Sequence, residues 1–177
     1  MSNVFFLGDL HLGHKNICGF RDQYGFTTSE EHDEAVLEGI EKTCNPKRDT
    51  LYLLGDVYFN AEAYALAARL SQSVQHLHLI LGNHDFNNGS NKGQIVMREF
   101  LEKGYVKTIR SLYKYKQVWL SHAPIHPVEL RGKKNIHGHV HFKTLDDDDY
   151  FNLSLENTKN FAPVAYEDII SREGLKR

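Results

Sequence analysis

The sequence HLHLILGNHD, residues 76–85, decides how the chain is interpreted. Its first six residues form an apolar run, which predicts a buried strand. Gly82 then allows the backbone to turn sharply. Asn83 follows with an amide oxygen, His84 with an imidazole and Asp85 with a carboxylate. Three such side chains directly after a strand indicate a site rather than an ordinary surface loop.

Two earlier stretches repeat this arrangement. Residues 3–8 and 51–54 are apolar and strand-like, and each run leads into a Gly-Asp pair. Helical signals separate the strands, as expected for α/β layering. We expect a helix that begins at a Thr28 cap and ends before Asn45-Pro46, a second over residues 60–70 capped by Asn60, and a third over residues 94–103 closed by Gly104.

The character of the chain changes after Gly104. Short strand-like segments follow one another, with connections that look too short for crossover helices, so we expect mostly antiparallel neighbours. A final helix is expected around residues 166–172. The fold class is therefore α/β, a four-layer αββα sandwich in one domain over residues 1–177, with two mixed sheets flanked by helices. The expected later strands are residues 105–109, 111–116, 118–121, 135–137 and 150–153.

Composition is that of an ordinary globular protein, with 41% hydrophobic and 25% charged residues among 177. Two cysteines form no disulfide framework, and no stretch is long and apolar enough for a signal peptide or a membrane span. We therefore expect a cytoplasmic protein with no membrane partner. Eleven histidines are many for this length.

Charge is unevenly distributed along the chain. Residues 91–135 contain ten Lys/Arg against three Asp/Glu, which gives +7 and leaves −9 for the remainder. This segment either faces the site and favours a phosphate-bearing substrate, or is a solvated surface. The aromatic residues within 105–119 either pack the sheet or bind nucleic acid. The acidic run 146–149 is expected at a solvated hairpin tip.

The three Gly-Asp and Gly-Asn turns should meet, because the carboxyl ends of strands share one edge of an α/β sheet. Two further histidine-bearing turns follow, at Ser121-His122 and at residues 137–141. Imidazoles, carboxylates and an amide oxygen without thiolates suit Mn²⁺, Fe or Zn²⁺. Two carboxylates, one amide oxygen and four of the imidazoles give seven candidate ligands. Seven are too many for one ion with an open position, whereas two ions sharing a carboxylate would use all of them.

Taken in order, five motif blocks resemble those of the calcineurin-like metallophosphoesterases, in particular the short phage and bacterial members of this family. The blocks span most of the chain: Asp9-x-His11, Gly55-Asp56, Gly82-Asn83-His84-Asp85, His122 and Gly138-His139-x-His141. The resemblance implies two packed sheets flanked by helices, with a dinuclear metal site at the carboxyl edge of the strands. It implies that Asp9, His11 and His141 hold one ion, that Asn83, His122 and His139 hold the other, and that Asp56 bridges them. Mn²⁺ is the expected metal, and Fe, Zn²⁺ and Ni²⁺ are the alternatives.

The resemblance also implies an activity. A hydroxide shared by the ions would attack a phosphate ester, His84 would assist the leaving oxygen, and Asp85 would orient His84. His14 and Arg21 either reach a substrate phosphate or pack against the first loop. We expect a phosphodiesterase acting on small phosphodiesters, nucleotides or nucleic-acid ends. A phosphomonoesterase or protein phosphatase is the alternative, and a non-catalytic binding scaffold of the same fold is a weaker one.

Overall fold

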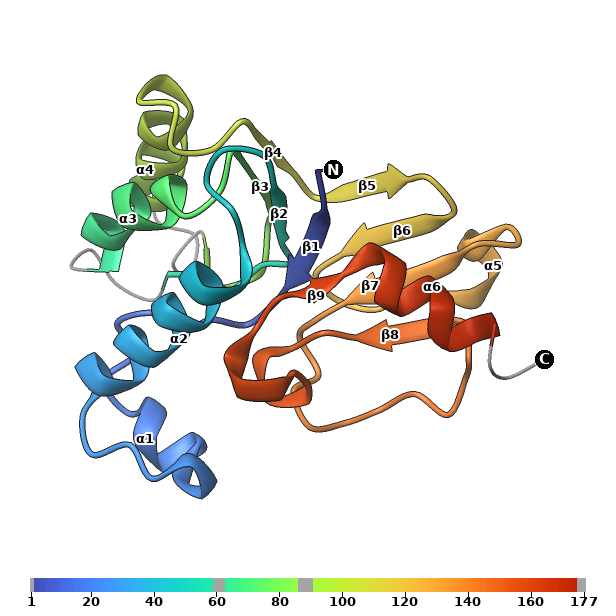
Figure 1. Cartoon of the computed structure of the whole chain (residues 1–177), viewed down its shortest axis with the longest axis horizontal. Coiled ribbons are helices and arrows are strands. Elements are labelled where there is room, and N and C mark those ends of the chain that lie inside the picture. Colours follow the sequence, from blue (N-terminus) through green and yellow to red (C-terminus); the bar gives the residue numbers. More distant parts are fainter. Residues whose placement is uncertain (1, 59–62, 86–90, 175–177) are drawn as a thin grey trace.

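A computed structural model describes residues 2–58, 63–85 and 91–174 of the chain. Its elements form two mixed sheets flanked by helices (Figure 1). In chain order they are β1 (Val4–Leu7), α1 (Ile17–Phe20), η1 (Asp22–Tyr24), α2 (Ser29–Thr43), β2 (Thr50–Leu53), η2 (Ala63–Ala65), α3 (Leu66–Gln72), β3 (His76–Ile80), α4 (Asn91–Glu102), β4 (Thr108–Arg110), β5 (Leu112–Tyr115), β6 (Val118–Ser121), α5 (Pro127–Leu130), β7 (Lys134–His137), β8 (Tyr150–Asn152), η3 (Leu155–Asn157), η4 (Lys159–Phe161), β9 (Val164–Ala165) and α6 (Tyr166–Gly174).

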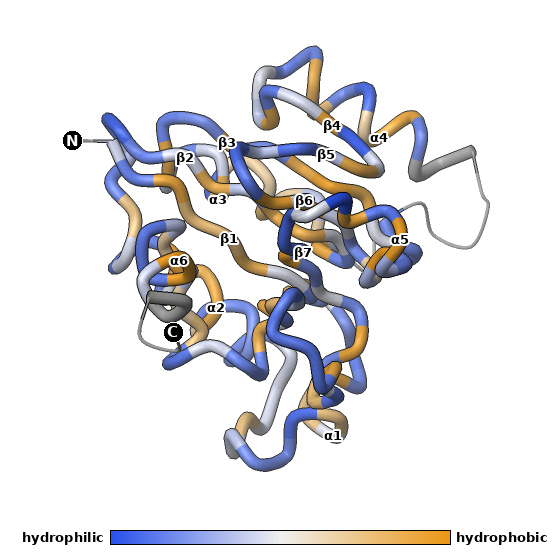
Figure 2. The backbone as a smooth tube through the Cα atoms, turned by 90° about the vertical axis from the view of Figure 1, so that its right-hand side faces the viewer, coloured by the Kyte–Doolittle hydropathy of each residue, from blue (hydrophilic) through white to orange (hydrophobic). Residues whose placement is uncertain are grey.

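The first sheet has the strand order β4-β3-β2-β1-β9 and the second has the order β5-β6-β7-β8. Strands β1 to β4 run parallel to one another, and only β9 is antiparallel. Side chains of β1 to β3 alternate between two cores, as strand geometry requires. One core lies between the first sheet and α2, α3 and α4, and the other lies between the two sheets and includes α6. Figure 2 shows the hydrophobic course of β1 through the middle of the molecule.

Helix α2 follows the predicted local rules. The Thr28 hydroxyl accepts a hydrogen bond from the Glu31 backbone N–H at 3.1 Å, which caps the helix. The Glu31 carboxylate reaches back to the Thr27 N–H at 2.8 Å, one residue earlier than in the usual capping box. Val36 and Ile40 turn the apolar side of the helix into the core.

The predicted pairing of the later strands was wrong. Only β5 and β6 are antiparallel, whereas β6 and β7, and also β7 and β8, pair in parallel. The connections over residues 122–133 and 138–149 are long enough to bring the chain back along the sheet, the first of them through α5. The acidic run 146–149 consequently lies in an exposed parallel crossover rather than at a hairpin tip. The strand expected over residues 105–109, grouped with the later strands, is observed as β4 (Thr108–Arg110) and belongs to the first sheet.

Two further differences concern the helices. Short α1, η1, η3 and η4 were not predicted, and α1 and η3 contribute Ile17, Phe20 and Glu156 to the cavity described below. The predicted cap at Asn60 lies outside the described residues, and the described part of that helix is α3 preceded by η2. Within the described residues, no helix is long and apolar enough to cross a membrane.

Candidate metal centre

Parallel pairing brings the ends of three strands to one edge of the first sheet. Leu7, Leu53 and Leu79 are register partners on β1, β2 and β3. The loops that follow these strands therefore start side by side, although they are far apart in sequence. This is the arrangement that the Gly-Asp and Gly-Asn turns predicted.

Histidines that follow strands of the second sheet lie at the same edge as the loops after β1, β2 and β3. His122 directly follows β6, and the segment 138–141 follows β7. The Gly138 N–H donates to the His122 carbonyl at 2.8 Å, and the His139 N–H donates to Oδ2 of Asp9 at 2.8 Å. The latter hydrogen bond joins the loop after β7 to the loop after β1, and so fixes the two sheets to each other at the site.

Glycine is required at these turns because of contacts with ligand residues. A Cβ on Gly82 would collide with the Asp56 carboxylate, and one on Gly138 would collide with that of Asp9. Gly55 has a φ of +88°, and a Cβ there would lie 2.6 Å from Nδ1 of His122. Each glycine therefore makes room for a side chain from a different loop.

The backbone at the candidate ligands is in an unusual conformation. Positive φ angles, from 51° to 73°, occur at five of the seven. Non-glycine residues adopt this left-handed region at a cost in free energy, and such residues concentrate at functional sites. The five are Asp9, His11, Asp56, His139 and His141.

Two groups of candidate ligands emerge. Ligand atoms of Asp9, His11 and His141 lie within 4.8 Å of one another, and so do those of Asp56, His122 and His139. Asn83 belongs with the second group, because its Oδ1 lies 3.0 Å from Nε2 of His122. The same Nε2 lies 3.1 Å from Nδ1 of His139.

Asp56 lies between the two groups. Its Oδ2 is 3.3 Å from Nε2 of His122 in the second group and 4.0 Å from Nε2 of His11 in the first. Nε2 of His84 is also 4.0 Å from this oxygen. The His84 backbone N–H donates to the other oxygen, Oδ1, at 2.8 Å, which orients the carboxylate.

The titration of these groups reflects their burial and their neighbours. Burial, reinforced by Arg21, lowers the pKa of His11 to about 3, so this imidazole is neutral at pH 7 and available to a metal. Burial also lowers the pKa of His139. For His122, burial acts in the opposite direction to a hydrogen bond with Asp56, and the net effect is a raised pKa.

The donor set fits divalent metal ions. Oδ1 of Asp9 is buried and accepts no hydrogen bond from the described residues, and burial raises the pKa of this carboxyl group. A cation at this position would satisfy that oxygen and favour the ionised form. Nitrogen and oxygen donors without sulfur are those that Mn²⁺, Fe and Zn²⁺ accept.

Asp85 has a different position from the one predicted. Its carboxylate accepts backbone hydrogen bonds from Gly82 at 2.7 Å, Val57 at 2.9 Å and Asp56 at 3.0 Å, instead of holding the ring of His84. The side chain is buried, and burial raises the pKa of Asp85 to about 6 although the N–H groups oppose that shift. Asp85 therefore ties the loop after β3 to the loop after β2.

For Arg21 the structure favours the second of the two alternatives, packing against the first loop, over contact with a substrate phosphate. The side chain is 1% exposed, and its donors are taken up within the protein. They bind Oε1 of Glu156 at 2.8 Å, the Asp9 carbonyl at 2.6 Å, the Leu10 carbonyl at 3.2 Å and Nε2 of His32 at 2.5 Å. Arg21 therefore holds the backbone of the loop after β1, which carries Asp9 and His11, in place.

Glu156 is the residue that sequence reasoning missed. Its Oε1 lies 3.0 Å from Nδ1 of His141, which leaves Nε2 of this ligand directed toward the first group. Burial opposes ionisation of Glu156, but His141 and Arg21 outweigh it and lower the pKa to about 2. The sequence contains no signal for this residue, because it lies in the unpredicted η3 turn. His32 of α2 is also buried, and its Nε2 lies 2.5 Å from Nη1 of Arg21.

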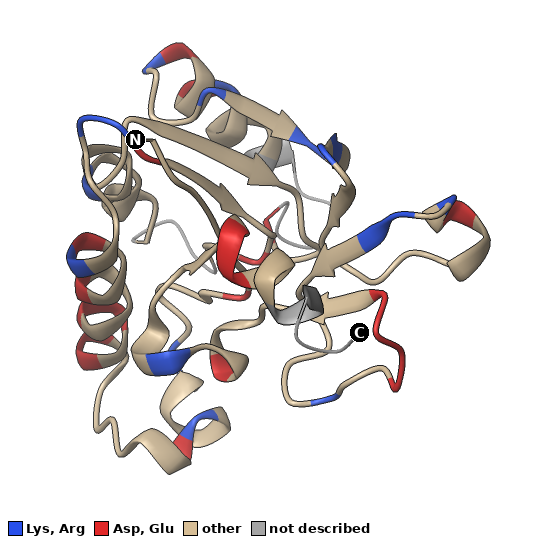
Figure 3. Cartoon of the chain, turned by 45° about the vertical axis from the view of Figure 1, so that its right-hand side comes forward, with Lys and Arg blue, Asp and Glu red and all other residues tan. Residues whose placement is uncertain are grey.

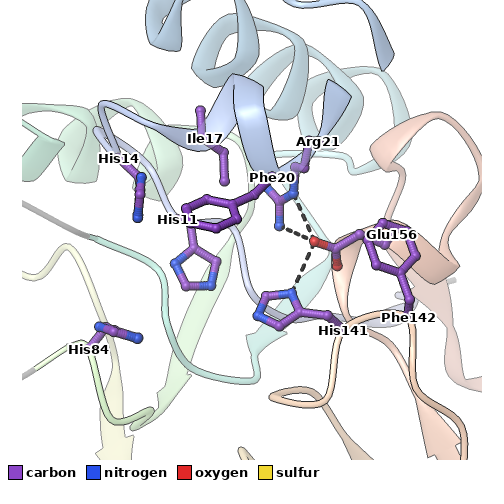
Figure 4. Close-up of a pocket in the computed structure, with 9 residues that line it drawn as sticks. All are labelled: His11, His14, Ile17, Phe20, Arg21, His84, His141, Phe142 and Glu156. Carbon is purple, nitrogen blue, oxygen red and sulfur yellow. Dashed lines mark hydrogen bonds and ion pairs between the residues drawn. The ribbon is translucent and has the colours of Figure 1, made fainter. Parts of the chain in front are cut away.

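His84 and His14 face an open cavity beside the first group (Figure 4). The cavity has a volume of about 510 Å³. The ring centroid of His11 lies 5.5 Å from that of His84 and 6.1 Å from that of His14. Both side chains can therefore reach a molecule that is held at the ligand groups.

Comparison with known proteins agrees with this geometry. The family described as calcineurin-like phosphoesterase matches residues 2–173. A Gene 66 protein of Mycobacterium phage L5 is 31% identical, over 80% of this chain and 78% of that protein. A Gene 66 protein of Mycobacterium phage D29 is 36% identical, over 48% of this chain and 41% of that protein.

Two solved structures share the fold. A protein of unknown function from Aquifex aeolicus, AQ665, has a TM-score of 0.71 with 22% identity, over 97% of this chain and 100% of that one. Phosphopantetheinyl hydrolase from Mycobacterium tuberculosis has a TM-score of 0.54 with 12% identity, over 92% of this chain and 95% of that one. With the family match over nearly the whole sequence and two His/Asp groups at the sheet edge, the chain belongs to the calcineurin-like phosphoesterase family and is a metal-dependent phosphoesterase.

Proposed function

We propose that this protein is a dinuclear, Mn²⁺-dependent phosphodiesterase that acts on small phosphodiesters, nucleotides or nucleic-acid ends. In this proposal Asp9, His11 and His141 hold one ion. Asn83, His122 and His139 hold the other, and Asp56 is shared. The shared position is supported by the distances of its Oδ2 to histidines of both groups, 3.3 Å and 4.0 Å.

Two divalent ions, when bound, would supply a nucleophile at neutral pH and neutralise charge on the phosphate. The side chains supply the remaining requirements. His84 is half-buried, lines the cavity and lies beside Asp56, so it is the candidate that delivers a proton to the leaving oxygen. Asp85 and Glu156 act indirectly, by holding the loop after β3 and the ring of His141.

The observation that favours diesters is that the guanidinium of Arg21 is already bound by acceptors within the protein. A phosphomonoester carries an additional charge, and its recognition gains from an available guanidinium. Of the described residues that line the cavity, Arg21 is the only one with a permanent positive charge. Because this guanidinium is bound to Glu156 and to backbone carbonyls, it offers little to a dianionic phosphate.

The position of the basic segment supports short substrates. Tyr115 pairs with Val118, the first residue of β6, whereas His122 follows the last. Lys114 and Lys116 are therefore near the end of the sheet opposite the site, and so is Lys134, which begins β7. Figure 3 shows how the basic and acidic residues are distributed over the chain. A long nucleic acid bound along these lysines would not be led directly to the ligand groups.

The test compares a diester and a monoester with the same leaving group. Protein loaded with Mn²⁺ should hydrolyse bis-p-nitrophenyl phosphate with a higher kcat/KM than p-nitrophenyl phosphate. A monoester preference would favour the phosphomonoesterase or protein-phosphatase alternative. Bound metal below one ion per chain, together with no hydrolysis of either compound, would favour a binding scaffold.

A further inference from the structure

The cavity beside the first ligand group has an apolar wall that the phosphoesterase chemistry leaves unexplained. Ile17, Phe20 and Phe142 line it together with His11, His84 and His141. In Figure 4, Phe20 comes from α1 and Phe142 from the chain beside the ligand His141. The phosphate site and the apolar wall are therefore continuous.

Both phenylalanines are unusually exposed for their size. Phe20 is 67% exposed and Phe142 is 56% exposed, and neither belongs to the two apolar cores. Exposing a large aromatic side chain sacrifices the free energy that its burial would give. Two such rings from separate segments, both at one cavity, indicate a surface that binds an apolar group.

Phe20 is held in place rather than loosely attached. Helix α1 is anchored by the buried Ile17, whose N–H donates to the His14 carbonyl at 2.9 Å. The ring of Phe20 meets the ring of His14 edge to face, with centroids 5.5 Å apart and planes at 86°. An aromatic side chain with such a fixed neighbour can bind a planar ring at a lower entropic cost.

The charge of the cavity argues against a ligand that carries a second anionic group in addition to its phosphate. Arg21 and Glu156 pair at 2.8 Å, so their charges largely compensate each other. The other described residues that line the cavity are histidines and apolar side chains. A volume of about 510 Å³ is within the usual range for a small-molecule site and accommodates more than a phosphate.

We propose that Phe20 and Phe142 bind the nucleobase of a nucleotide substrate whose phosphate lies at the ligand histidines. This inference rests on the proposed function and extends it, because it identifies the group attached to the phosphate. Stacking on aromatic side chains accepts any base, so the site selects nucleotides as a class and discriminates weakly among bases.

The experiment measures binding of three phosphates to the Mn²⁺-loaded protein by titration calorimetry. Adenosine 5′-monophosphate and ribose 5-phosphate share sugar and phosphate and differ in the base, and n-hexyl phosphate offers a flexible apolar chain. The nucleotide should bind at least about tenfold more tightly than either of the others. Phe20→Ala combined with Phe142→Ala should remove this advantage and leave the affinity for ribose 5-phosphate unchanged. Ile95→Ala, which truncates an exposed apolar side chain of α4, is the matched control and should change nothing.

Equal affinities for the nucleotide and ribose 5-phosphate would overturn the base site, and so would hexyl phosphate binding as tightly as the nucleotide. Hydrolysis of bis-p-nitrophenyl phosphate in the same preparation separates this inference from the proposed function. Intact diester hydrolysis without base preference contradicts the base site alone. Base preference without diester hydrolysis supports the base site and contradicts the diesterase.

Discussion

Nδ1 of His141 lies 3.0 Å from Oε1 of Glu156, and that oxygen also accepts a hydrogen bond from Nε of Arg21 at 2.8 Å. Carboxylates that bind the second nitrogen of a ligand histidine fix its ring and increase its basicity. Arg21 in turn donates to the carbonyls of Asp9 and Leu10. One buried chain of contacts therefore supports two loops of the first ligand group.

Glu156→Gln tests this support. The change removes the negative charge that faces Arg21 and weakens the orientation of His141. Affinity for Mn²⁺ should fall about 10- to 100-fold, measured by titration calorimetry. Glu129→Gln, which breaks an exposed ion pair with Arg131, is the control and should leave the affinity intact. Identical affinities in the two variants would contradict the role of Glu156.

Gly82→Ala tests the close approach of the loops. The added methyl group would collide with the Asp56 carboxylate, so metal binding should be lost and the melting temperature should fall. Gly19→Ala places a methyl group where no atom lies within 4 Å, and both properties should be retained. Wild-type metal affinity in Gly82→Ala would show that Asp56 can move without consequence.

His84→Ala should separate turnover from metal binding. Two metal ions should remain bound, while kcat falls about 10²- to 10⁴-fold, as expected when a general acid is lost. The loss should be larger for an alkyl leaving group than for p-nitrophenolate, which needs little protonation. His126→Ala removes a side-chain cap at α5 and serves as the control for histidine removal. Unchanged turnover in His84→Ala would exclude the residue from the reaction.

Asp85→Asn should act mainly through stability. An amide offers one acceptor oxygen in place of two and cannot accept all three backbone N–H groups. Leaving buried donors unsatisfied costs roughly 1–3 kcal/mol, so the melting temperature should fall measurably. If Asp85→Asn instead lowered turnover as His84→Ala does, without any loss of stability, the orienting role expected from the sequence would be restored.

Metal affinity should depend on pH. A hydrogen bond with Glu156 raises the pKa of His141, and Asp56 raises that of His122 against the effect of burial. Protons therefore compete with the metal at these imidazoles at a higher pH than they would at an ordinary histidine. The affinity for metal should fall as pH decreases, by roughly tenfold per pH unit for each proton displaced. His11, with a pKa of about 3, adds nothing to this slope above pH 5. Calorimetric titrations at pH 6.0 and 7.5 measure the effect, and equal affinities would contradict it.

The sequence predicted the convergence of the candidate ligands because local patterns determine it. A strand that ends in Gly-Asp or Gly-Asn needs only parallel pairing to bring its polar residue to the common edge. Glu156 was missed for the opposite reason, since its role depends on a contact with a residue 15 positions away and not on any local pattern. The sequence left two roles open for Arg21, because it gives the charge of a side chain but not the acceptors that surround it, and the structure favours packing against the first loop.

The pairing of the second sheet was misjudged for a related reason. Connection length distinguishes a hairpin from a crossover only when the connection is very short. The connections before and after β7 contain the candidate ligands His122, His139 and His141. In the second connection, Gly138 and His139 donate backbone hydrogen bonds to His122 and Asp9, contacts that strand pairing alone does not predict. The strands themselves, including β6 and β8, were found close to their predicted positions.

The left-handed backbone at five of the candidate ligands has a consequence for protein engineering. Glycine would relieve the backbone strain at any of these positions. At Asp9 and Asp56, however, the same change would leave the backbone N–H groups of His139 and His84 without their carboxylate acceptors, which costs free energy at a buried site. A redesign that scores backbone conformation alone would therefore choose glycine at positions where the side chain both ties neighbouring loops together and is a candidate metal ligand.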